Sequence, residues 1–235
     1  VKRILIALDA IPEVVNEAIA EKADLVITHH PFIFKPLKNI RKDHILGKCI
    51  YDLIQNNISV YSAHTNLDIA FGGTNDVLAQ ILELENISIL SELEFKGQDI
   101  EAKYGMGRIG TLKRSYTLDE FAKFVQDKLK LPNIRIVGAS NHLVNKVALT
   151  TGSGMSYLQD AVNKKADVFI TGDVKFHDAQ RALQMGISLI DAGHYGTENL
   201  IVPVIKEHLE KMQKPDHALE ILISKVNGEP FRVNI

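Results

Sequence analysis

The stretch that decides the fold is Asp24-Leu-Val-Ile-Thr-His-His-Pro31. Its apolar run, Leu25–Ile27, predicts a short buried strand, and Pro31 prevents that strand from continuing. Neighbouring side chains of an extended chain point to opposite sides, so His29 and His30 are poorly placed to bind one ion together. Each could instead hold one of two ions. Strand ends are also where open α/β sheets bind their ligands.

The composition is that of an ordinary globular protein. The chain has 235 residues, enough for one large or two small domains, with 46% hydrophobic and 24% charged residues. A formal net charge of −2 makes nucleic acid an improbable partner. The single cysteine, Cys49, excludes an internal disulfide and suits the cytoplasm. We find neither a membrane-length apolar run nor a secretory signal pattern. Because the chain begins Val-Lys-Arg-Ile-Leu-Ile, without methionine and already inside a strand, we expect the natural N-terminus to be missing.

Apolar periodicity predicts strands and helices in alternation. We expect strands over 2–8, 24–28, 58–62, 134–137, 146–151, 167–171 and 187–191. We expect helices over 12–22, 43–56, 75–84, 117–129, 154–164, 175–185 and 197–211. Residues 86–112 read as a strand, a charged linker and another strand, and 219–224 and 229–234 as terminal strands. Such alternation implies largely parallel sheets with helices on their faces.

An internal repeat divides the chain. Lys22–Thr28 (KADLVIT) recurs as Lys165–Thr171 (KADVFIT), and Ile58–Ala63 matches Ile187–Ala192. Shared hydrophobic patterning is the alternative explanation, but the identities at polar positions favour duplication. We therefore expect two pseudo-symmetric α/β halves with a cleft between them. The first half would span residues 1–90, the connecting segment 91–135 and the second half 136–235.

Histidines and acids gather at the expected strand ends. Both matched third strands run into a His-x-x-x-acid pattern, His64…Asp68 and His194…Glu198. The spacing at a helix start would place His194 and Glu198 on one face. A single histidine is more often structural than a ligand, but the whole group favours a metal site. Mixed imidazole and carboxylate ligation suits zinc, iron or manganese.

Four motifs carry a family resemblance, and together they span nearly the whole chain. They are Ile27–Leu37 (ITHHPFIFKPL), Ala63–Asp68 (AHTNLD), Ala166–Asp173 (ADVFITGD) and Gly193–Glu198 (GHYGTE). The chain resembles the NGG-one-interacting-factor-three-like family, also called GTP cyclohydrolase 1 type 2-like. The resemblance implies a toroidal homohexamer with a dinuclear metal centre between two similar α/β halves.

The resemblance also implies a ligand set. His30 and Asp68 would hold one divalent ion, His29 and His194 the other, and Glu198 would bridge them. His64 matches a histidine beside the centre and is expected in the second shell or as an occasional ligand. The family's first helix and loop are absent here, which fits a truncated N-terminus. Its large inserted domain is also absent, replaced by a short linker around 90–104.

The expected function is that of a metal-dependent hydrolase. Two ions would activate water near neutral pH, and His64 is our candidate proton carrier because imidazole titrates in that range. The family name suggests ring opening of GTP, while another nucleotide or a phosphoester is an equally compatible small-molecule substrate. The alternative is a non-enzymatic metal-binding scaffold or regulatory interaction protein.

Three further motifs give weaker evidence of function. Gly105–Gly110 (GMGRIG) matches the G-x-G-x-x-G pattern of dinucleotide-binding sites, but it lacks the preceding strand and the helix directly after it that such a site needs. We therefore expect a glycine-rich strand or hairpin. Gly152–Gly154 suits an anion site or a tight turn equally well. We expect Asp173 to cap a helix or support the site from the second shell. His177 could instead move protons.

Two lysines follow the paired histidines. We expect Lys35 and Lys38 to be solvated, with attraction of an anion as the alternative.

Overall fold

The fold was obtained as a computed structural model that describes residues 1–93, 104–213 and 218–232. The chain forms two compact units. The first comprises Val1–Leu67 and Ile201–Pro230, and the second comprises Asp68–Leu200 and Phe231–Ile235. The repeat-based bounds of 1–90, 91–135 and 136–235 describe a different property, the extent of the duplication, and stay a prediction. No helix among the described residues is long and apolar enough to span a membrane.

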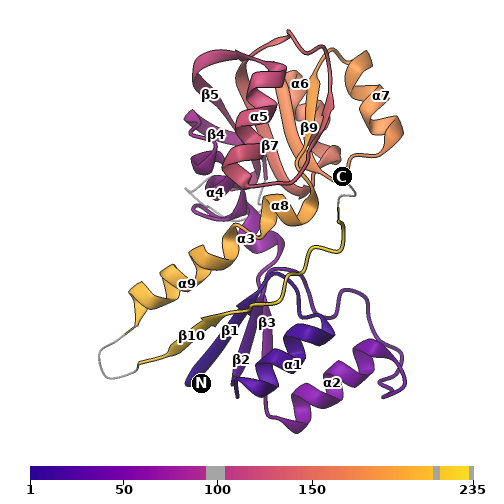
Figure 1. Cartoon of the computed structure of the whole chain (residues 1–235), viewed down its shortest axis with the longest axis vertical. Helices are drawn as coiled ribbons and strands as arrows, with labels where there is room; N and C mark the ends of the chain where they lie inside the picture. Colours follow the sequence, from indigo (N-terminus) through magenta and orange to yellow (C-terminus); the bar gives the residue numbers. More distant parts are fainter. Residues whose placement is uncertain (94–103, 214–217, 233–235) are drawn as a thin grey trace. The chain divides into compact units, whose positions relative to one another are not determined.

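The first unit is a parallel sheet between helices (Figure 1). Its strands lie in the order β10-β1-β2-β3 and all pair in parallel. The strands are β1 (Arg3–Ala7), β2 (Leu25–Thr28), β3 (Ser59–Ser62) and β10 (Glu220–Ile223). The helices are α1 (Pro12–Ala20), α2 (Ile45–Gln55) and α9 (Ile201–Met212).

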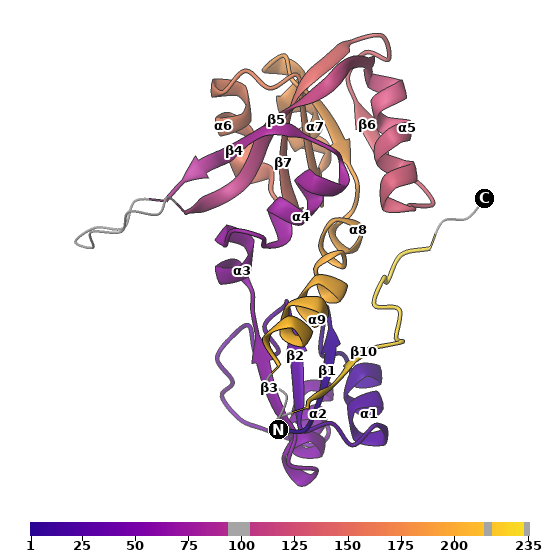
Figure 2. The same cartoon turned by 90° about the vertical axis from the view of Figure 1, so that its left-hand side faces the viewer.

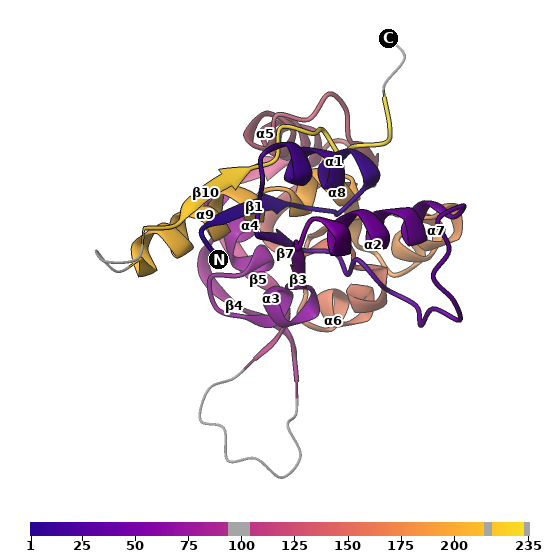
Figure 3. The same cartoon turned by 90° about the horizontal axis from the view of Figure 1, so that it is seen from below.

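Alternation along the strands builds the core of this unit. Leu5 of β1 and Val26 of β2 are fully buried and pack with α1 and α2, which lie side by side (Figure 3). Val15 of α1 and Leu53 of α2 complete this cluster. Helix α9 packs on β1 and β10, and its first residue, Ile201, is buried. Burial on both faces explains why β1 and β2 read as continuous apolar runs.

The second unit is a mixed six-stranded sheet in the order β4-β5-β7-β8-β9-β6 (Figure 2). Strands β7, β8 and β9 are parallel, and β4, β5 and β6 pair antiparallel to their neighbours. The strands are β4 (Glu85–Glu92), β5 (Gly105–Thr117), β6 (Arg135–Val137), β7 (Leu143–Ser153), β8 (Val168–Gly172) and β9 (Ser188–Asp191). The helices are α4 (Thr74–Ile81), α5 (Leu118–Leu129), the 3-10 turn η1 (Met155–Tyr157), α6 (Leu158–Asn163), α7 (Phe176–Gln184) and α8 (His194–Glu198).

Two buried clusters lie on the two faces of this sheet. Leu149 of β7 and Ile170 of β8 pack with α4 and α5, where Phe121 is fully buried. Ala148 and Phe169, one position away on the same strands, pack with α6 and α7. The second unit therefore has three layers, as a largely parallel sheet requires.

The repeat appears as one strand register used twice. Ile4 pairs with Leu25 in the first unit, and Val147 pairs with Val168 in the second. The third strands repeat the register, with Leu25 opposite Ser59 and Val168 opposite Ser188. The prediction that Lys22–Thr28 and Lys165–Thr171 are equivalent elements is confirmed at the level of strand position and pairing.

The repeated Lys-Ala-Asp has a structural cause. Lys22 and Lys165 both adopt positive φ, 53° and 57°, in the turn between helix and strand. Asp24 Oδ2 accepts the backbone N–H groups of Lys2 and Arg3 at the start of β1. Asp167 Oδ2 binds two N–H groups at the equivalent place in β7, those of residues 145 and 146. The identity at these polar positions thus preserves one hydrogen-bonded strand entry.

Several expectations need correction. The helix expected over 197–211 is two helices, α8 and α9, separated at 199–200. Helix α4 has Gly73 as its N-cap, and Thr117 and Glu120 form a capping box at the start of α5. Gly105–Gly110 lies in strand β5, as expected.

The terminal strands are only partly borne out. The strand expected over 219–224 is β10, and the described residues of 229–234, which end at 232, contain no strand. Most of the linker around 90–104 lies outside the described residues.

Candidate metal centre

Three histidines of the first unit converge at the carboxyl end of its parallel sheet. His29 and His30 follow β2, and His64 follows β3. The His29 ring centroid lies 5.2 Å from that of His30 and 5.4 Å from that of His64. The donor atoms of His29 lie within 4.8 Å of those of both neighbours. His29 is completely buried. Three imidazole side chains therefore cluster around a buried position at this edge of the sheet.

Each of the adjacent histidines has one ring nitrogen held by an acceptor. His29 Nδ1 donates to the carbonyl oxygen of Ala63 at 2.7 Å. His30 Nδ1 donates to Asp9 Oδ1 at 2.7 Å. In the neutral tautomer with the proton on Nδ1, the lone pair that can bind an ion lies on Nε2. Metal-ligating histidines are held in this way by a carbonyl or carboxylate partner.

Asp68 lies in α3 (Thr65–Ile69), a five-residue helix that contains the junction between the two units. Its side chain is buried, with 7% relative exposure. Thr74 donates its hydroxyl to Asp68 Oδ1 at 2.6 Å, and the Asn75 amide donates to the backbone carbonyl of Asp68 at 3.0 Å. These contacts fix both the backbone and one carboxylate oxygen of Asp68.

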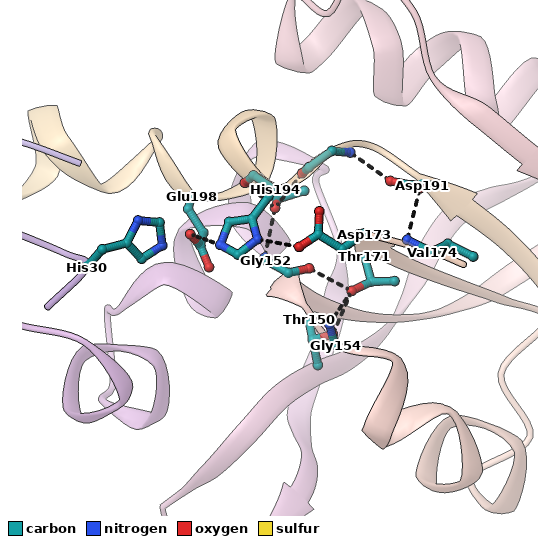
Figure 4. A network of polar contacts seen from close by, with 12 residues as sticks. His30, Thr150, Gly152, Gly154, Thr171, Asp173, Val174, Asp191, His194 and Glu198 are labelled. Atoms are coloured by element: carbon teal, nitrogen blue, oxygen red, sulfur yellow. Dashed lines mark hydrogen bonds and ion pairs between the residues drawn. The ribbon is translucent and has the colours of Figure 1, made fainter. Parts of the chain in front are cut away.

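His194 and Glu198 form a pair on α8, as their spacing predicts (Figure 4). His194 Nε2 lies 2.9 Å from Glu198 Oε2, and His194 Nδ1 lies 2.7 Å from Asp173 Oδ2. The hydrogen bond to Glu198 raises the pKa of His194 to about 9, with Asp173 adding to the rise and burial opposing it. Without metal, the imidazole is therefore held as a cation between two carboxylates.

Two features of the second unit hold His194 and Glu198 in position (Figure 4). Asp191, at the end of β9, accepts the backbone N–H groups of Val174 and Gly193, which adjoin Asp173 and His194 respectively. Gly152 has a φ of 59°, and a Cβ there would collide with Glu198 Oε1. Glycine is therefore needed both for the backbone conformation and for the close approach of Glu198.

The structure distinguishes the roles of the weaker candidates, Asp173, His177 and Gly152–Gly154. Asp173 binds the imidazole of His194 through Oδ2 but does not cap α7, whose N-cap is Lys175. His177 is exposed and contacts Gln180. The backbone amides of Gly152 and Gly154 donate to Thr197 and Thr171. Because these amides are used internally, the tight turn explains Gly152–Gly154 better than an anion site does.

The lysines after the histidine pair are exposed, as expected. Lys38 also lines a cavity of about 250 Å³ with Arg41 and His44, and attraction of an anion by this lysine stays a prediction.

Sequence reasoning missed the residues that support the ligand candidates. Asp9 could have been found from strand pairing, because Ala7 lies opposite Thr28 and the same register continued places Asp9 opposite His30. Thr74, Asn75 and Thr151 gave no comparable signal. A Thr-Asn pair after glycines reads simply as a helix start.

Fold and side chains together define a class: an α/β protein with imidazole and carboxylate sets at the carboxyl ends of parallel strands. The donor chemistry of these sets fits divalent transition-metal ions. The profile of Duf34/NIF3 (NGG1p interacting factor 3) matches residues 1–230, and the chain belongs to that family.

Individual relatives agree with the assignment. The chain is 37% identical over 233 residues to a Clostridium acetobutylicum protein named GTP cyclohydrolase 1 type 2 homolog, covering 99% of this chain and 85% of that one. A Bacillus cereus protein related to NIF3 has a similar crystal structure, with a TM-score of 0.91 and 29% identity, covering 100% and 90% of the two chains. The Staphylococcus aureus protein SA1388 gives a TM-score of 0.84 at 32% identity, covering 98% and 87%.

Proposed function

We propose that this chain binds two divalent transition-metal ions and uses them to hydrolyse a nucleotide or another phosphoester. The ligands are His30 and Asp68 for one ion, His29 and His194 for the other, and Glu198 as the bridge. The observation that carries the proposal is the shared arrangement of three histidines. In His29, His30 and His194, Nδ1 is held by an oxygen acceptor within the residue's own unit.

This arrangement supports metal binding because it prepares the ligands in advance. A histidine with a fixed Nδ1 partner presents Nε2 in one orientation, and the partner raises the basicity of that nitrogen. Asp68 and Glu198 are both buried, with 7% and 5% relative exposure. Buried carboxylates are costly unless they are paired or bind a cation. Zinc, iron and manganese all accept this mixture of nitrogen and oxygen donors.

The hydrolytic part of the proposal rests on the chemistry that such a donor set supports. Divalent ions held there would act as Lewis acids that activate water and polarise the bond under attack. The name of the Clostridium acetobutylicum relative suggests GTP as the first substrate to try.

His64 is the residue that we assign to proton transfer. Its ring centroid lies 5.4 Å from that of His29 and 5.9 Å from that of His30. This position suits a proton carrier beside the ions, and it also suits a further ligand. A proton carrier should affect turnover more than metal content, which makes the two roles separable.

The decisive experiment is elemental analysis followed by a substrate screen. Purified protein, stripped with a chelator and reloaded separately with zinc, iron or manganese, should approach two ions per chain. The reloaded protein is then assayed with GTP, other nucleotides and a chromogenic phosphoester. Metal-dependent turnover supports the hydrolase. Two bound ions without turnover of any substrate would favour the metal-binding scaffold, and failure to bind an ion would refute the proposal.

Two wider expectations accompany this function. The family resemblance supports a homohexameric assembly, which light scattering of the metal-loaded protein would test. The single cysteine, Cys49, is compatible with a reducing compartment, so we place the protein in the cytoplasm.

A further inference from the structure

Three buried polar residues of the second unit are not explained by packing. Thr74, Asn75 and Thr151 have relative exposures of 1%, 0% and 8%. A buried polar side chain costs free energy unless its hydrogen bonds are made. We therefore asked where the donors and acceptors of these three side chains are directed.

Their hydrogen bonds lead from strand β7 to Asp68. Thr151 Oγ1 donates to Thr74 Oγ1 at 3.0 Å, and Thr74 Oγ1 donates onward to Asp68 Oδ1 at 2.6 Å. In parallel, the backbone N–H of Thr151 donates to Asn75 Oδ1 at 3.0 Å. The Asn75 side-chain amide donates to the Asp68 carbonyl at 3.0 Å. The side chain and the backbone of Asp68 are thus both tied to one residue of β7.

The next residue of β7 supports the other carboxylate. Gly152 follows Thr151, donates its N–H to Thr197 Oγ1 at 2.9 Å, and lies directly against Glu198. The end of β7 therefore touches the supports of both Asp68 and Glu198. Because a central strand is rigid, this end can fix the two carboxylates with respect to each other.

We propose that Thr74, Asn75 and Thr151 are positioning residues that hold Asp68 for metal binding. The Thr74 hydroxyl binds the Asp68 carboxylate, and the Asn75 amide binds its backbone carbonyl. This inference rests on the proposed function, and it adds the residues that control one of the two ions selectively. Loss of the Thr151 hydroxyl would affect the Asp68 ion while leaving the His29 and His194 ion in place.

The experiment compares three variants at adjacent positions of β7. Thr151→Val removes the hydroxyl at nearly constant volume, and Thr151→Ser restores it. Thr150→Val is the matched control, because Thr150 is also buried on the same strand but its hydroxyl donates to Thr171. Each chelator-stripped protein is titrated with zinc alone in a calorimeter, and its thermal unfolding is measured without metal.

Wild-type protein should show two binding events. Thr151→Val should weaken one of them by about 10–100-fold, the usual effect of removing a partner of a metal ligand. Thr151→Ser and Thr150→Val should bind both ions with wild-type affinity. This result, together with similar metal-free unfolding temperatures for the two valine variants, would support a positioning role.

Other outcomes are equally decisive. Unchanged affinities in Thr151→Val would overturn the inference while the proposed function stands. Equal weakening in both valine variants would also overturn it, because the effect would then be general to the strand. If Thr151→Val does not fold, Thr74→Val and Thr74→Ser give the same comparison one bond closer to Asp68. Absence of zinc binding by wild-type protein would refute the proposed function itself.

Discussion

His30 donates from Nδ1 to the carboxylate of Asp9 at 2.7 Å, and the two residues stand at matching positions beyond neighbouring parallel strands. The second unit contains the same type of contact between His194 and Asp173, also at 2.7 Å. The two units thus orient a histidine with a carboxylate from an adjacent loop. Such partners affect metal affinity without being ligands.

Asp9→Ala should therefore reduce the affinity for zinc by about 10–100-fold. The change removes the acceptor that fixes the His30 ring, so the ring must be ordered when the ion binds. Calorimetric titration of the stripped protein measures the effect. Asp43→Ala is the control, because Asp43 is an exposed residue of the same unit that pairs with Arg41. Equal affinities in the two variants would contradict the assigned role of Asp9.

The raised pKa of His194 predicts how metal-free stability depends on pH. A group with a folded pKa near 9 and an ordinary value of 6.5 stabilises the fold fully below about pH 6.5. That contribution is lost as the pH rises through about 9. The unfolding temperature of the stripped wild-type protein should therefore fall relative to His194→Asn over this interval. A constant difference between the two proteins would show that His194 is not held as a cation.

Gly152→Ala should disturb metal binding without changing a ligand. The new Cβ would collide with Glu198 Oε1 and lie 3.2 Å from His194 Nε2. Gly186→Ala is a matched control because Gly186 also has positive φ, 75°, but has no neighbouring atom within 4 Å of the added Cβ. Both changes carry a backbone cost of about 1–2 kcal/mol. Elemental analysis should show metal loss only in Gly152→Ala, and equal metal content would remove the steric argument.

His64→Asn and His194→Asn should differ in their effects on metal content and turnover. If His64 is a proton carrier, its variant should keep both ions and lose about 10²–10⁴-fold in turnover. His194→Asn should lose an ion and activity together. Bound metal and turnover are measured on the same samples. Metal loss in the His64 variant would make His64 a ligand, and full activity would leave it a structural role.

Breaking the buried ion pair between Arg108 and Asp76 should destabilise the protein strongly. Arg108 is 2% exposed, and it also donates to the carbonyl oxygens of Gly105, Gly107 and Ala70. Arg108→Met leaves these acceptors and the Asp76 charge without their donor, and should cost about 3–5 kcal/mol in unfolding free energy.

An exposed pair provides the comparison for that estimate. Lys123→Met breaks the contact to Asp127 on α5 and should cost about 0–1 kcal/mol. Urea unfolding measures both variants. Similar losses in the two would mean that burial of Arg108 contributes little.

The order of elements and the candidate ligands could be predicted from sequence because they depend on local patterns. Apolar runs place β2 and β8, and His29 and His30 follow β2 directly. The spacing of His194 and Glu198 predicted their contact on α8. The break between α8 and α9 was missed because apolar periodicity continues across it.

The supporting residues could not be predicted from local patterns. Thr151 is separated from Thr74 by 77 positions, and only the packing of α4 against β7 brings them together. Arg108 reads as a surface residue until the pairing of β5 places it in the core. Long-range polar contacts of this kind depend on tertiary structure, which sequence periodicity does not encode.

The place of β10 in the first sheet has a consequence for synthesis. β10 pairs with β1 along its length, yet Arg3 and its partner Glu220 are 217 positions apart. As the chain leaves the ribosome, β1 can pair with β2 early, but its other side must wait until the whole second unit has emerged. Such an unpaired strand edge is a site of aggregation. The second unit can therefore finish folding before the first, and the outer edge of β1 stays exposed until β10 pairs with it.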